Sequence, residues 1–248
     1  LIAADMPVAD AAERIAFGKA FNAGQTCVAP DYVLCPEDKL DALVDALHQR
    51  LSAMYPSLRE NPDYSWIINQ RQYQRLNNWL QQAENQGARL IRINPANEDL
   101  SGTRIIAPTL VLDADDGMTL LQEEIFGPVL PILPYRDLQE ALDYIAARPR
   151  PLALYYFGYN RREQQRIMQL THAGGMCIND TVLHVAQDDM PFGGIGPSGM
   201  GHYHGHEGFL TFSKAKGVYI KQRFNGARPI YAPYGGRLLQ WVYTLFIR

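Results

Sequence analysis

Cysteine is scarce in this chain, and its cysteines follow no regular spacing. Only Cys27, Cys35 and Cys177 occur among 248 residues, an odd number that does not match a framework of paired disulfides. Free thiols are typical of proteins in a reducing compartment, because disulfides persist mainly in oxidising ones. We therefore expect a cytoplasmic protein with free thiols.

An excess of charge of either sign and a long apolar run are also absent. The 23 lysines and arginines and the 26 aspartates and glutamates leave a formal net charge of -3 at pH 7. No basic cluster indicates a nucleic-acid partner. The apolar stretch near the C-terminus is shorter than the roughly 20 residues that a membrane-spanning helix needs. We expect neither a nucleic-acid partner nor a membrane span.

Helical and strand patterns alternate along the chain. Apolar residues recur every three or four positions in some segments, and short extended apolar runs separate these segments. Helices are expected at 11–23, from Pro36 to Leu51, at 71–86, at 138–145 and at 161–171. Strands are expected at 31–35, 88–93, part of 105–112, 129–133, 152–157 and 176–178. This order favours an α/β fold with a mostly parallel sheet.

Particular residues mark the expected ends of these helices. Asp10, with Glu13 three positions later, has the spacing of a capping box. Asp137 can cap the helix that follows it, and Pro36 suits the first position of a helix. Gly87 fits the C-terminal end of the helix at 71–86.

The C-terminal residues 216–248 differ from the rest, which we take as one domain of residues 1–215. Residues 216–222 are expected to form a strand that joins another subunit or closes the sheet. Beyond them, apolar residues follow helical spacing: Leu238, Leu239, Val242, Leu245 and Phe246. We expect this helical tail to pack against the rest of the protein.

One thiol is presented at the end of the segment Phe21–Cys27, Phe-Asn-Ala-Gly-Gln-Thr-Cys. Gly24 permits a sharp turn, because it has no Cβ, and Cys27 follows three residues later. A loop on a rigid scaffold is a suitable place for a nucleophile; the alternative is a buried structural thiol. We interpret Cys35, at a strand–helix junction, as a small buried apolar residue.

Three motifs together resemble the aldehyde dehydrogenase superfamily. They are Gly-Gln-Thr-Cys at 24–27, Glu-Glu-Ile-Phe-Gly-Pro-Val at 123–129, and Pro-Phe-Gly-Gly-Ile-Gly-Pro-Ser-Gly-Met-Gly at 191–201. Their order and separation are those of the family, and the resemblance covers nearly the whole chain. Tyr-His-Gly at 203–205 and the Pro- and Tyr-rich tail are similar to the class 3-like branch, and within it to the bacterial coniferyl aldehyde dehydrogenase type.

The resemblance implies a three-layer αβα catalytic domain with a mostly parallel sheet. Family members are about twice as long, and their N-terminal half carries the dinucleotide-binding fold, an oxyanion-binding Asn and the Glu that acts as general base. None of these is expected within the 248 residues. We therefore expect a catalytic-domain fragment that is inactive alone and belongs to a homodimeric enzyme.

The resemblance also implies a role for each motif. Cys27 would add to an aldehyde as a thiolate and give a thiohemiacetal, and hydride would leave to a nicotinamide. Water would then hydrolyse the resulting thioester, and the backbone N–H of Cys27 would help to bind the oxyanion. Glu124 would bind the hydroxyls of the nicotinamide ribose, and Phe126 would pack beside it. NAD is favoured over NADP.

The substrate side is assigned by the same resemblance. Asn179 would hold the catalytic loop by hydrogen bonds. Val182, Val185 and Ala186 would line the substrate entrance, and Phe192 would flank Cys27. Small apolar residues with an aromatic ring suit an aromatic, coniferyl-type aldehyde or an aliphatic one.

Two other functions are compatible with the residues. The first is a cysteine hydrolase or esterase, which would pair Cys27 with His172 or His184. The second is an inactive fragment that serves as an oligomerisation module. The alternating His202, His204 and His206 could suggest zinc, but the family resemblance explains Tyr-His-Gly at 203–205 as structural, and we expect no metal.

Overall fold

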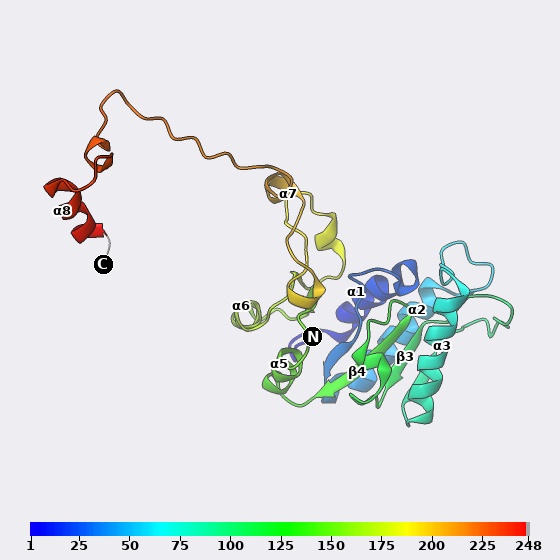
Figure 1. Cartoon of the computed structure of the whole chain (residues 1–248). Helices are drawn as coiled ribbons and strands as arrows, with labels where there is room; N and C mark the ends of the chain where they lie inside the picture. Colours follow the sequence, from blue (N-terminus) through cyan, green and yellow to red (C-terminus); the bar gives the residue numbers. More distant parts are fainter. Residues whose placement is uncertain (247–248) are drawn as a thin grey trace. The chain divides into compact units, whose positions relative to one another are not determined.

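The computed structural model describes residues 1–246 of the chain (Figure 1). It comprises two units, Leu1–Phe212 and Ser213–Arg248, which are considered separately. The division lies close to residue 215, where the sequence suggested a boundary.

The first unit contains a four-stranded sheet and a two-stranded sheet. The strands are β1 (Val33–Pro36), β2 (Arg89–Arg92), β3 (Thr109–Leu112), β4 (Val129–Tyr135), β5 (Ala153–Tyr156) and β6 (Gly175–Ile178). The larger sheet has the order β1-β4-β3-β2, and only β2 runs antiparallel to its neighbour. Strands β5 and β6 pair in parallel. The prediction of a mostly parallel sheet is confirmed.

The first three residues join the two sheets. Ile2 donates its backbone N–H to the carbonyl of Leu34 in β1, at 2.9 Å. Ala3 donates to the carbonyl of Phe157, directly after β5, and Phe157 donates back to Leu1. Because this segment bonds to both β1 and β5, the two sheets form one continuous hydrogen-bonded surface.

Helices complete the two outer layers of this unit. The larger ones are α1 (Val8–Ala20), α2 (Leu40–Met54), α3 (Gln70–Asn85), α5 (Leu138–Ala146) and α6 (Arg161–Leu170). The shorter ones are η1 (Phe21–Gly24), η2 (Glu37–Lys39), α4 (Thr119–Gln122), η3 (Leu183–Ala186), η4 (Gly196–Ser198) and α7 (Gly205–Thr211).

Alternate residues of the central strands face opposite layers. Leu130 and Ile132 of β4 pack in one apolar cluster with α1 and α2, whereas Val129 packs in another with α3. Neighbouring side chains of a strand point to opposite faces, so the sheet lies between these helices. The predicted three-layer αβα fold is confirmed. The predicted stripe of α2 is also confirmed, with Leu43, Val44, Leu47 and Leu51 buried.

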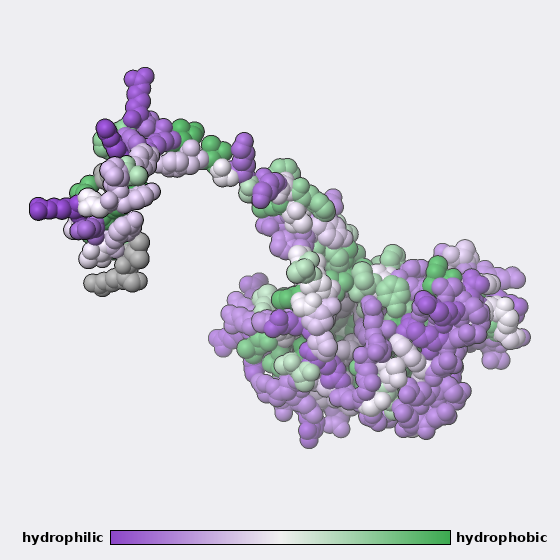
Figure 2. All heavy atoms as spheres, viewed as in Figure 1, coloured by the Kyte–Doolittle hydropathy of each residue, from purple (hydrophilic) through white to green (hydrophobic). Residues whose placement is uncertain are grey.

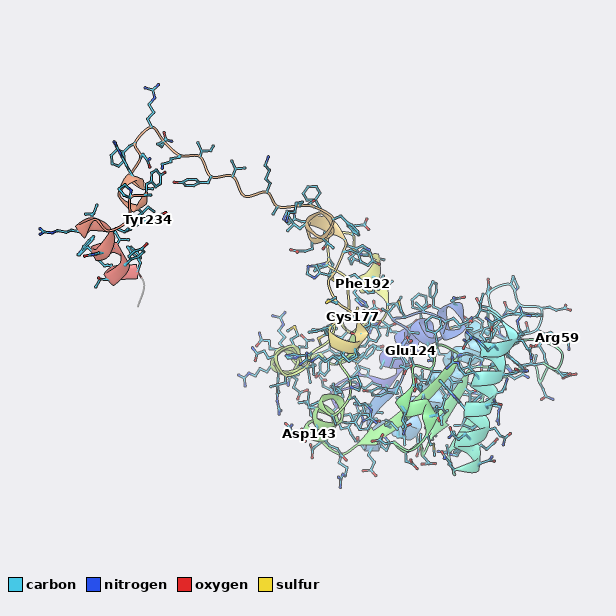
Figure 3. The ribbon with its side chains drawn as sticks, in the orientation of Figure 1. Arg59, Glu124, Asp143, Cys177, Phe192 and Tyr234 are labelled. Atoms are coloured by element: carbon cyan, nitrogen blue, oxygen red, sulfur yellow. The ribbon has the colours of Figure 1, made fainter. Side chains whose placement is uncertain are left out.

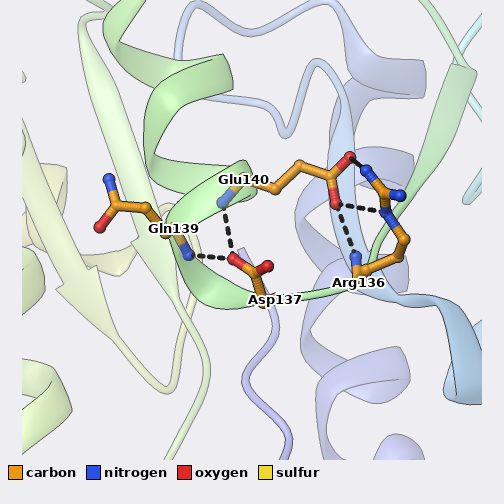
Figure 4. Close-up of polar contacts among 4 residues, drawn as sticks. All are labelled: Arg136, Asp137, Gln139 and Glu140. Carbon is orange, nitrogen blue, oxygen red and sulfur yellow. Dashed lines mark hydrogen bonds and ion pairs between the residues drawn. The ribbon is translucent and has the colours of Figure 1, made fainter.

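The predicted N-cap of α5 is present (Figure 4). Asp137 Oδ1 accepts hydrogen bonds from the backbone N–H groups of Gln139, at 2.9 Å, and Glu140, at 3.0 Å. The Glu140 carboxylate in turn accepts from the backbone N–H of Arg136 and pairs with its guanidinium. Donors of the first turn, which have no partner within the helix, are thereby satisfied.

Three expectations about the first part of the chain were wrong. Helix α1 begins at Val8 after Pro7, so Asp10 lies inside its first turn and does not cap it. The α1 helix ends at Ala20, because Asn22 and Ala23 turn to positive φ. Pro36 ends β1, where it pairs with Tyr135, and does not begin a helix.

Strand β6, expected at 176–178, is half-buried along its length. Within residues 1–246 it pairs with β5 alone, so its other edge lacks a covering strand.

The second unit contains η5 (Arg228–Ile230) and α8 (Arg237–Phe246). Residues 216–222 have no strand partner within the described chain, so they do not close the sheet here, and a strand that joins another subunit stays a prediction. The helical tail is present as α8, where Leu239 is buried and Leu238 and Leu245 are exposed. Figure 2 shows hydrophobic residues exposed among hydrophilic ones in this unit. No helix of the described residues is long and apolar enough to cross a membrane.

Candidate active site

The turn that carries Cys27 has an unusual backbone. Asn22, Ala23 and Gly24 follow one another with φ values of 51°, 51° and 71°. Such conformations cost non-glycine residues about 1 kcal/mol or more each, and they persist only where the surroundings enforce them. At Gly24 a Cβ would lie 2.2 Å from the carbonyl oxygen of Gly127. The turn therefore packs directly on the loop after Glu124, and Cys27 is exposed at its end.

Gln25 ties this turn to a separate segment of the chain. Its side-chain Oε1 accepts from the backbone N–H of Ile68 at 2.9 Å. Its Nε2 donates to the carbonyl oxygens of Asn22 and Trp66, both at 3.1 Å. These bonds hold the residues before Cys27 in place.

Tyr155 of β5 holds the residue after Cys27. Its hydroxyl donates to the carbonyl of Val28 at 2.6 Å and accepts from the backbone N–H of Val182 at 3.2 Å. Burial raises the pKa of this phenol above its ordinary value, so the hydroxyl keeps its proton. Cys27 thus lies between two anchored neighbours.

Cys35 contrasts with Cys27. It is fully buried in β1, and burial raises the pKa of its thiol to about 12. Since the thiolate is the reactive form, Cys35 is inert near neutral pH. Its interpretation as a small buried apolar residue is confirmed.

A cavity of about 600 Å³ opens beside the cysteine turn, and Cys27, Glu124 and Phe126 all line it. Figure 3 labels Glu124 in the loop that precedes β4. Other lining residues come from the segments before β1 and β5 and from the glycine-rich turn: Asp31, Tyr32, Arg148, Arg150, Pro197 and Ser198. Cys27 and the pair Glu124 and Phe126, about a hundred positions apart in the sequence, therefore share one surface.

Charged groups surround Glu124. Burial and then the Asp31 carboxylate raise the pKa of Glu124, and Arg75 and Lys19 oppose this effect. Lys19 is 4% exposed, and its Nζ has no hydrogen-bond partner among the described residues. Burial lowers the pKa of Lys19 to about 8, whereas Asp31 and Glu124 act in the opposite direction.

Asn179 connects the ends of two strands and does not line this cavity. Its Oδ1 accepts from the backbone N–H of Gly158 at 2.8 Å, and its Nδ2 donates to the carbonyl of the same residue at 3.1 Å. Asn179 itself has a φ of 59°. It therefore fixes the start of the loop that follows β6.

The other residues expected on the substrate side also lie away from the cavity lining: Val182, Val185, Ala186 and Phe192. Phe192 is nearly buried, with its ring 6.0 Å from that of His184 and 5.7 Å from that of Tyr203. Val182 has a φ of 63°, which is rare for a β-branched residue. The first unit thus brings Cys27, Glu124 and Phe126 together and places the substrate-side residues elsewhere.

The histidines do not complete a cysteine-hydrolase site. Neither ring nitrogen of His184 has a hydrogen-bond partner within the described part of the chain, and burial lowers the pKa of this imidazole. No hydrogen bond links Cys27 to His184 or His172 among residues 1–246. His202 pairs with Glu207 at 3.1 Å, and the described residues hold no group of three or more potential metal ligands.

The glycine-rich segment folds into a tight turn, as the sequence suggested. A Cβ on Gly193 would lie 2.1 Å from the carbonyl oxygen of Gly201, and one on Gly194 would lie 2.1 Å from that of Ser198. Such close approach of two backbones requires glycine.

Sequence reasoning missed four residues of the site: Lys19, Asp31, Arg75 and Tyr155. Asp31 stands four positions after Cys27, at the start of an expected strand. Arg75 and Lys19 lie on helices whose periodicity indicates only the apolar face. Their roles depend on contacts between distant segments, which no local pattern indicates.

The fold and the site define a class of protein: a three-layer α/β domain that presents a cysteine thiol to an open cavity beside a carboxylate. The comparison with known families is more specific. A model of the aldehyde dehydrogenase family matches residues 1–218, and the chain belongs to this family. The resemblance noted from the three motifs is thereby confirmed.

Two relatives are informative. The chain is 56% identical to a probable coniferyl aldehyde dehydrogenase of Pseudomonas aeruginosa, over all of this chain and 51% of that protein. It is 48% identical to a coniferyl aldehyde dehydrogenase of a Pseudomonas species, over 95% of this chain and 50% of that protein. The chain therefore spans about half the length of these relatives.

Solved structures similar to this chain are also aldehyde dehydrogenases. The substrate-bound state of Staphylococcus aureus AldH matches 99% of this chain and 52% of its own, with a TM-score of 0.84 and 39% identity. An aldehyde dehydrogenase of Mycobacterium tuberculosis in complex with NAD+ matches 90% of this chain and 46% of its own, with a TM-score of 0.78 and 29% identity.

Proposed function

We propose that this chain is the catalytic part of an NAD(P)-dependent aldehyde dehydrogenase that converts an aldehyde to the carboxylic acid. The observation that carries the proposal is the convergence of Cys27, Glu124 and Phe126 on one cavity. Membership of the family supports it. The alternative that the 248 residues alone form an inactive fragment is also compatible with the comparison, because the relatives are about twice as long.

Cys27 performs the covalent step. Its sulfur adds to the aldehyde carbon and forms a tetrahedral thiohemiacetal, whose oxygen the backbone N–H of Cys27 stabilises. Loss of hydride from that carbon leaves a thioester on Cys27, and water releases the acid. The anchors at Gln25 and Tyr155 hold the sulfur in one place for both steps, which lowers the entropic cost of reaching the transition state.

The residues present fit a nicotinamide dinucleotide. The carboxylate of Glu124 faces the cavity, and among the described residues its side chain has no hydrogen-bond partner. It can therefore accept bonds from two neighbouring ribose hydroxyls, while Phe126, 40% exposed, offers a flat apolar surface beside it. When bound, the nicotinamide supplies the hydride acceptor.

The similarity to coniferyl aldehyde dehydrogenases favours an aromatic, coniferyl-type aldehyde over an aliphatic one. Asn179 supports the loop on the substrate side. The entrance role of Val182, Val185, Ala186 and Phe192 is proposed for the complete enzyme alone, because none of them lines the Cys27 cavity in this chain. NAD is favoured over NADP, since a structural relative is known in complex with NAD+. Free thiols at Cys27, Cys35 and Cys177 support a cytoplasmic location, and we propose a homodimer without a resident metal.

The test is Cys27→Ser in the longest natural protein that contains this chain. NAD-linked oxidation of coniferyl aldehyde should fall by at least about a thousandfold, because the hydroxyl is a much weaker nucleophile. The matched control is Cys177→Ser, which should retain activity. The proposal is wrong if the Cys27 variant remains as active as the wild type, or if the wild-type protein reduces neither NAD nor NADP with any aldehyde.

A further inference from the structure

Side chains of the loop between α4 and β4 are alternately buried in the core and exposed to the cavity. Ile125 is fully buried in the cluster beneath α3, whereas Glu124 and Phe126 are exposed to the cavity. Phe126 has a φ of 49°, which a non-glycine residue adopts only under constraint. Because this loop is neither helix nor strand, its partly buried backbone groups need partners from elsewhere.

Asp31 supplies one of these partners. Its Oδ1 accepts a hydrogen bond from the backbone N–H of Ile125 at 3.1 Å. The contact joins residues 94 positions apart in the chain. Asp31 follows Cys27 by four residues, so this bond ties the segment of the nucleophile to the segment of the cofactor-binding carboxylate.

Arg75 of α3 supplies the partners for the neighbouring carbonyls. Its Nη2 donates to the carbonyl oxygen of Ile125 at 2.5 Å, and its Nη1 donates to that of Glu124 at 3.3 Å. The guanidinium is itself fixed, because Nε donates to Gln72 at 2.6 Å and the group lies 4.1 Å from the ring centroid of Trp79. A planar group held in this way defines the direction of both carbonyls.

Two cations lie close to both carboxylates. Burial raises the pKa of Asp31, and the positive charges of Lys19 and Arg75 oppose this effect. Burial and then Asp31 raise the pKa of Glu124, and Arg75 and Lys19 again act in the opposite direction. The two cations thus reduce the cost of holding two carboxylates close together.

We infer that Asp31 and Arg75 are positioning residues that clamp the Glu124 loop on the Cys27 turn and thereby set where the nicotinamide ribose is held. The inference rests on the function proposed above and extends it to two residues that act through the backbone of the Glu124 loop. Gly24 completes the contact, because the absence of a Cβ lets the turn meet Gly127. A shift of about 1 Å in such a carboxylate is enough to reduce the rate of a positioned reaction strongly.

The experiment compares four variants in the complete enzyme that contains this chain. Arg75→Ala and Asp31→Ala remove the two halves of the clamp. Asp31→Asn keeps an oxygen that can accept from Ile125, and Arg71→Ala is the matched control. Arg71 lies one turn earlier on α3, is exposed, and has no recorded partner within residues 1–246.

The clamp predicts a specific pattern of kinetic changes. Arg75→Ala and Asp31→Ala should raise KM for NAD by at least about tenfold, the effect of losing charge-assisted hydrogen bonds. Asp31→Asn should restore KM to within about threefold of the wild type. Alkylation of Cys27 by iodoacetamide should change by less than about twofold in every variant, since Gln25 and Tyr155 still anchor the turn.

Each outcome has one meaning. An unchanged KM for NAD in Arg75→Ala overturns the clamp, and this variant alone decides the matter if Asp31→Ala does not fold. An equal loss in Arg71→Ala, or a parallel change in the alkylation rate, would show a merely structural effect and would also overturn it. Failure of the wild type to oxidise aldehydes, or full activity of Cys27→Ser, counts instead against the proposed function.

Discussion

The two sides of the Cys27 turn are held by different forces. On the cofactor side, Lys19, Asp31 and Arg75 surround Glu124 with charges of both signs. On the other side, His184, Phe192, Tyr203 and His204 pack as rings, and the ring nitrogens of His184 have no hydrogen-bond partner among the described residues. Tyr155 stands between them and bonds to Val28 and Val182.

This difference has a physical reason. Charged hydrogen bonds have strict geometry, and they suit the placement of a carboxylate for which we propose a contact with two ribose hydroxyls. Ring packing has a preferred distance but tolerates small shifts. The cofactor side is therefore expected to respond sharply to point changes and to pH, and the aromatic side only weakly.

Gly24→Ala should have the largest effect, because it separates the turn from the Glu124 loop. The new Cβ would lie 2.2 Å from Gly127 O at a φ of 71°, and we expect a loss of about 4 kcal/mol in the free energy of unfolding. Gly102→Ala is the control, since Gly102 has a φ of 73° but open space around it. Urea denaturation of this chain should show a loss of only about 1 kcal/mol there; equal losses would mean that the contact with Gly127 is unimportant.

Lys19→Met should alter the pH dependence of stability. The folded pKa of Lys19 is about 8 and its ordinary value is 10.5, so between these values the unfolded chain holds a proton that the folded chain has lost. The free energy of unfolding should therefore rise with pH in this window, by up to about 1.4 kcal/mol per pH unit. Urea midpoints at pH 7.5, 9 and 10 should show this rise in wild type and in an exposed control, Lys216→Met, but not in Lys19→Met.

Tyr155→Phe should weaken the boundary between the two sides. It leaves the buried carbonyl of Val28 and the N–H of Val182 without a partner, at a cost of about 1–3 kcal/mol. Alkylation of Cys27 should become faster as the turn loosens. Tyr159→Phe is the control, because the exposed hydroxyl of Tyr159 makes only a long hydrogen bond, 3.4 Å, to Asp10. This variant should change the free energy of unfolding by less than about 0.5 kcal/mol. Similar results for both variants would contradict a holding role for Tyr155.

His184→Met should produce the smallest effect. Burial lowers the pKa of His184 below 6.5, so below that pH the unfolded chain binds a proton that the folded chain does not. Stability of the wild type should fall as the pH drops from 6.5 to 5, by less than about 1.4 kcal/mol per unit. The variant should lose this component of the slope, whereas an exposed control, His172→Gln, should keep it. A slope that His184→Met leaves unaltered would show that this imidazole is not buried as described.

The sequence by itself determined the order of most elements and indicated the residues that we propose to be reactive. Apolar spacing located α2 and its buried stripe, and Asp137 marked the start of α5. The motifs around Cys27, Glu124 and Phe126 indicated the family, because each motif is a short run of particular residues that can be recognised without the fold. Predictions at Asp10 and Pro36 were wrong, since a helix start depends on which neighbour the chain meets as well as on local preference.

Only the tertiary structure decided which residues support the reactive ones. Asp31 contacts Ile125 across 94 positions, and Arg75 reaches the same loop across 50. Lys19 is a charged residue near the end of a helix, yet it is buried in the fold. Such contacts arise when whole layers pack, and their free energy depends on burial and on distances between segments. A local pattern contains neither quantity, so the clamp around Glu124 is visible only in the folded chain.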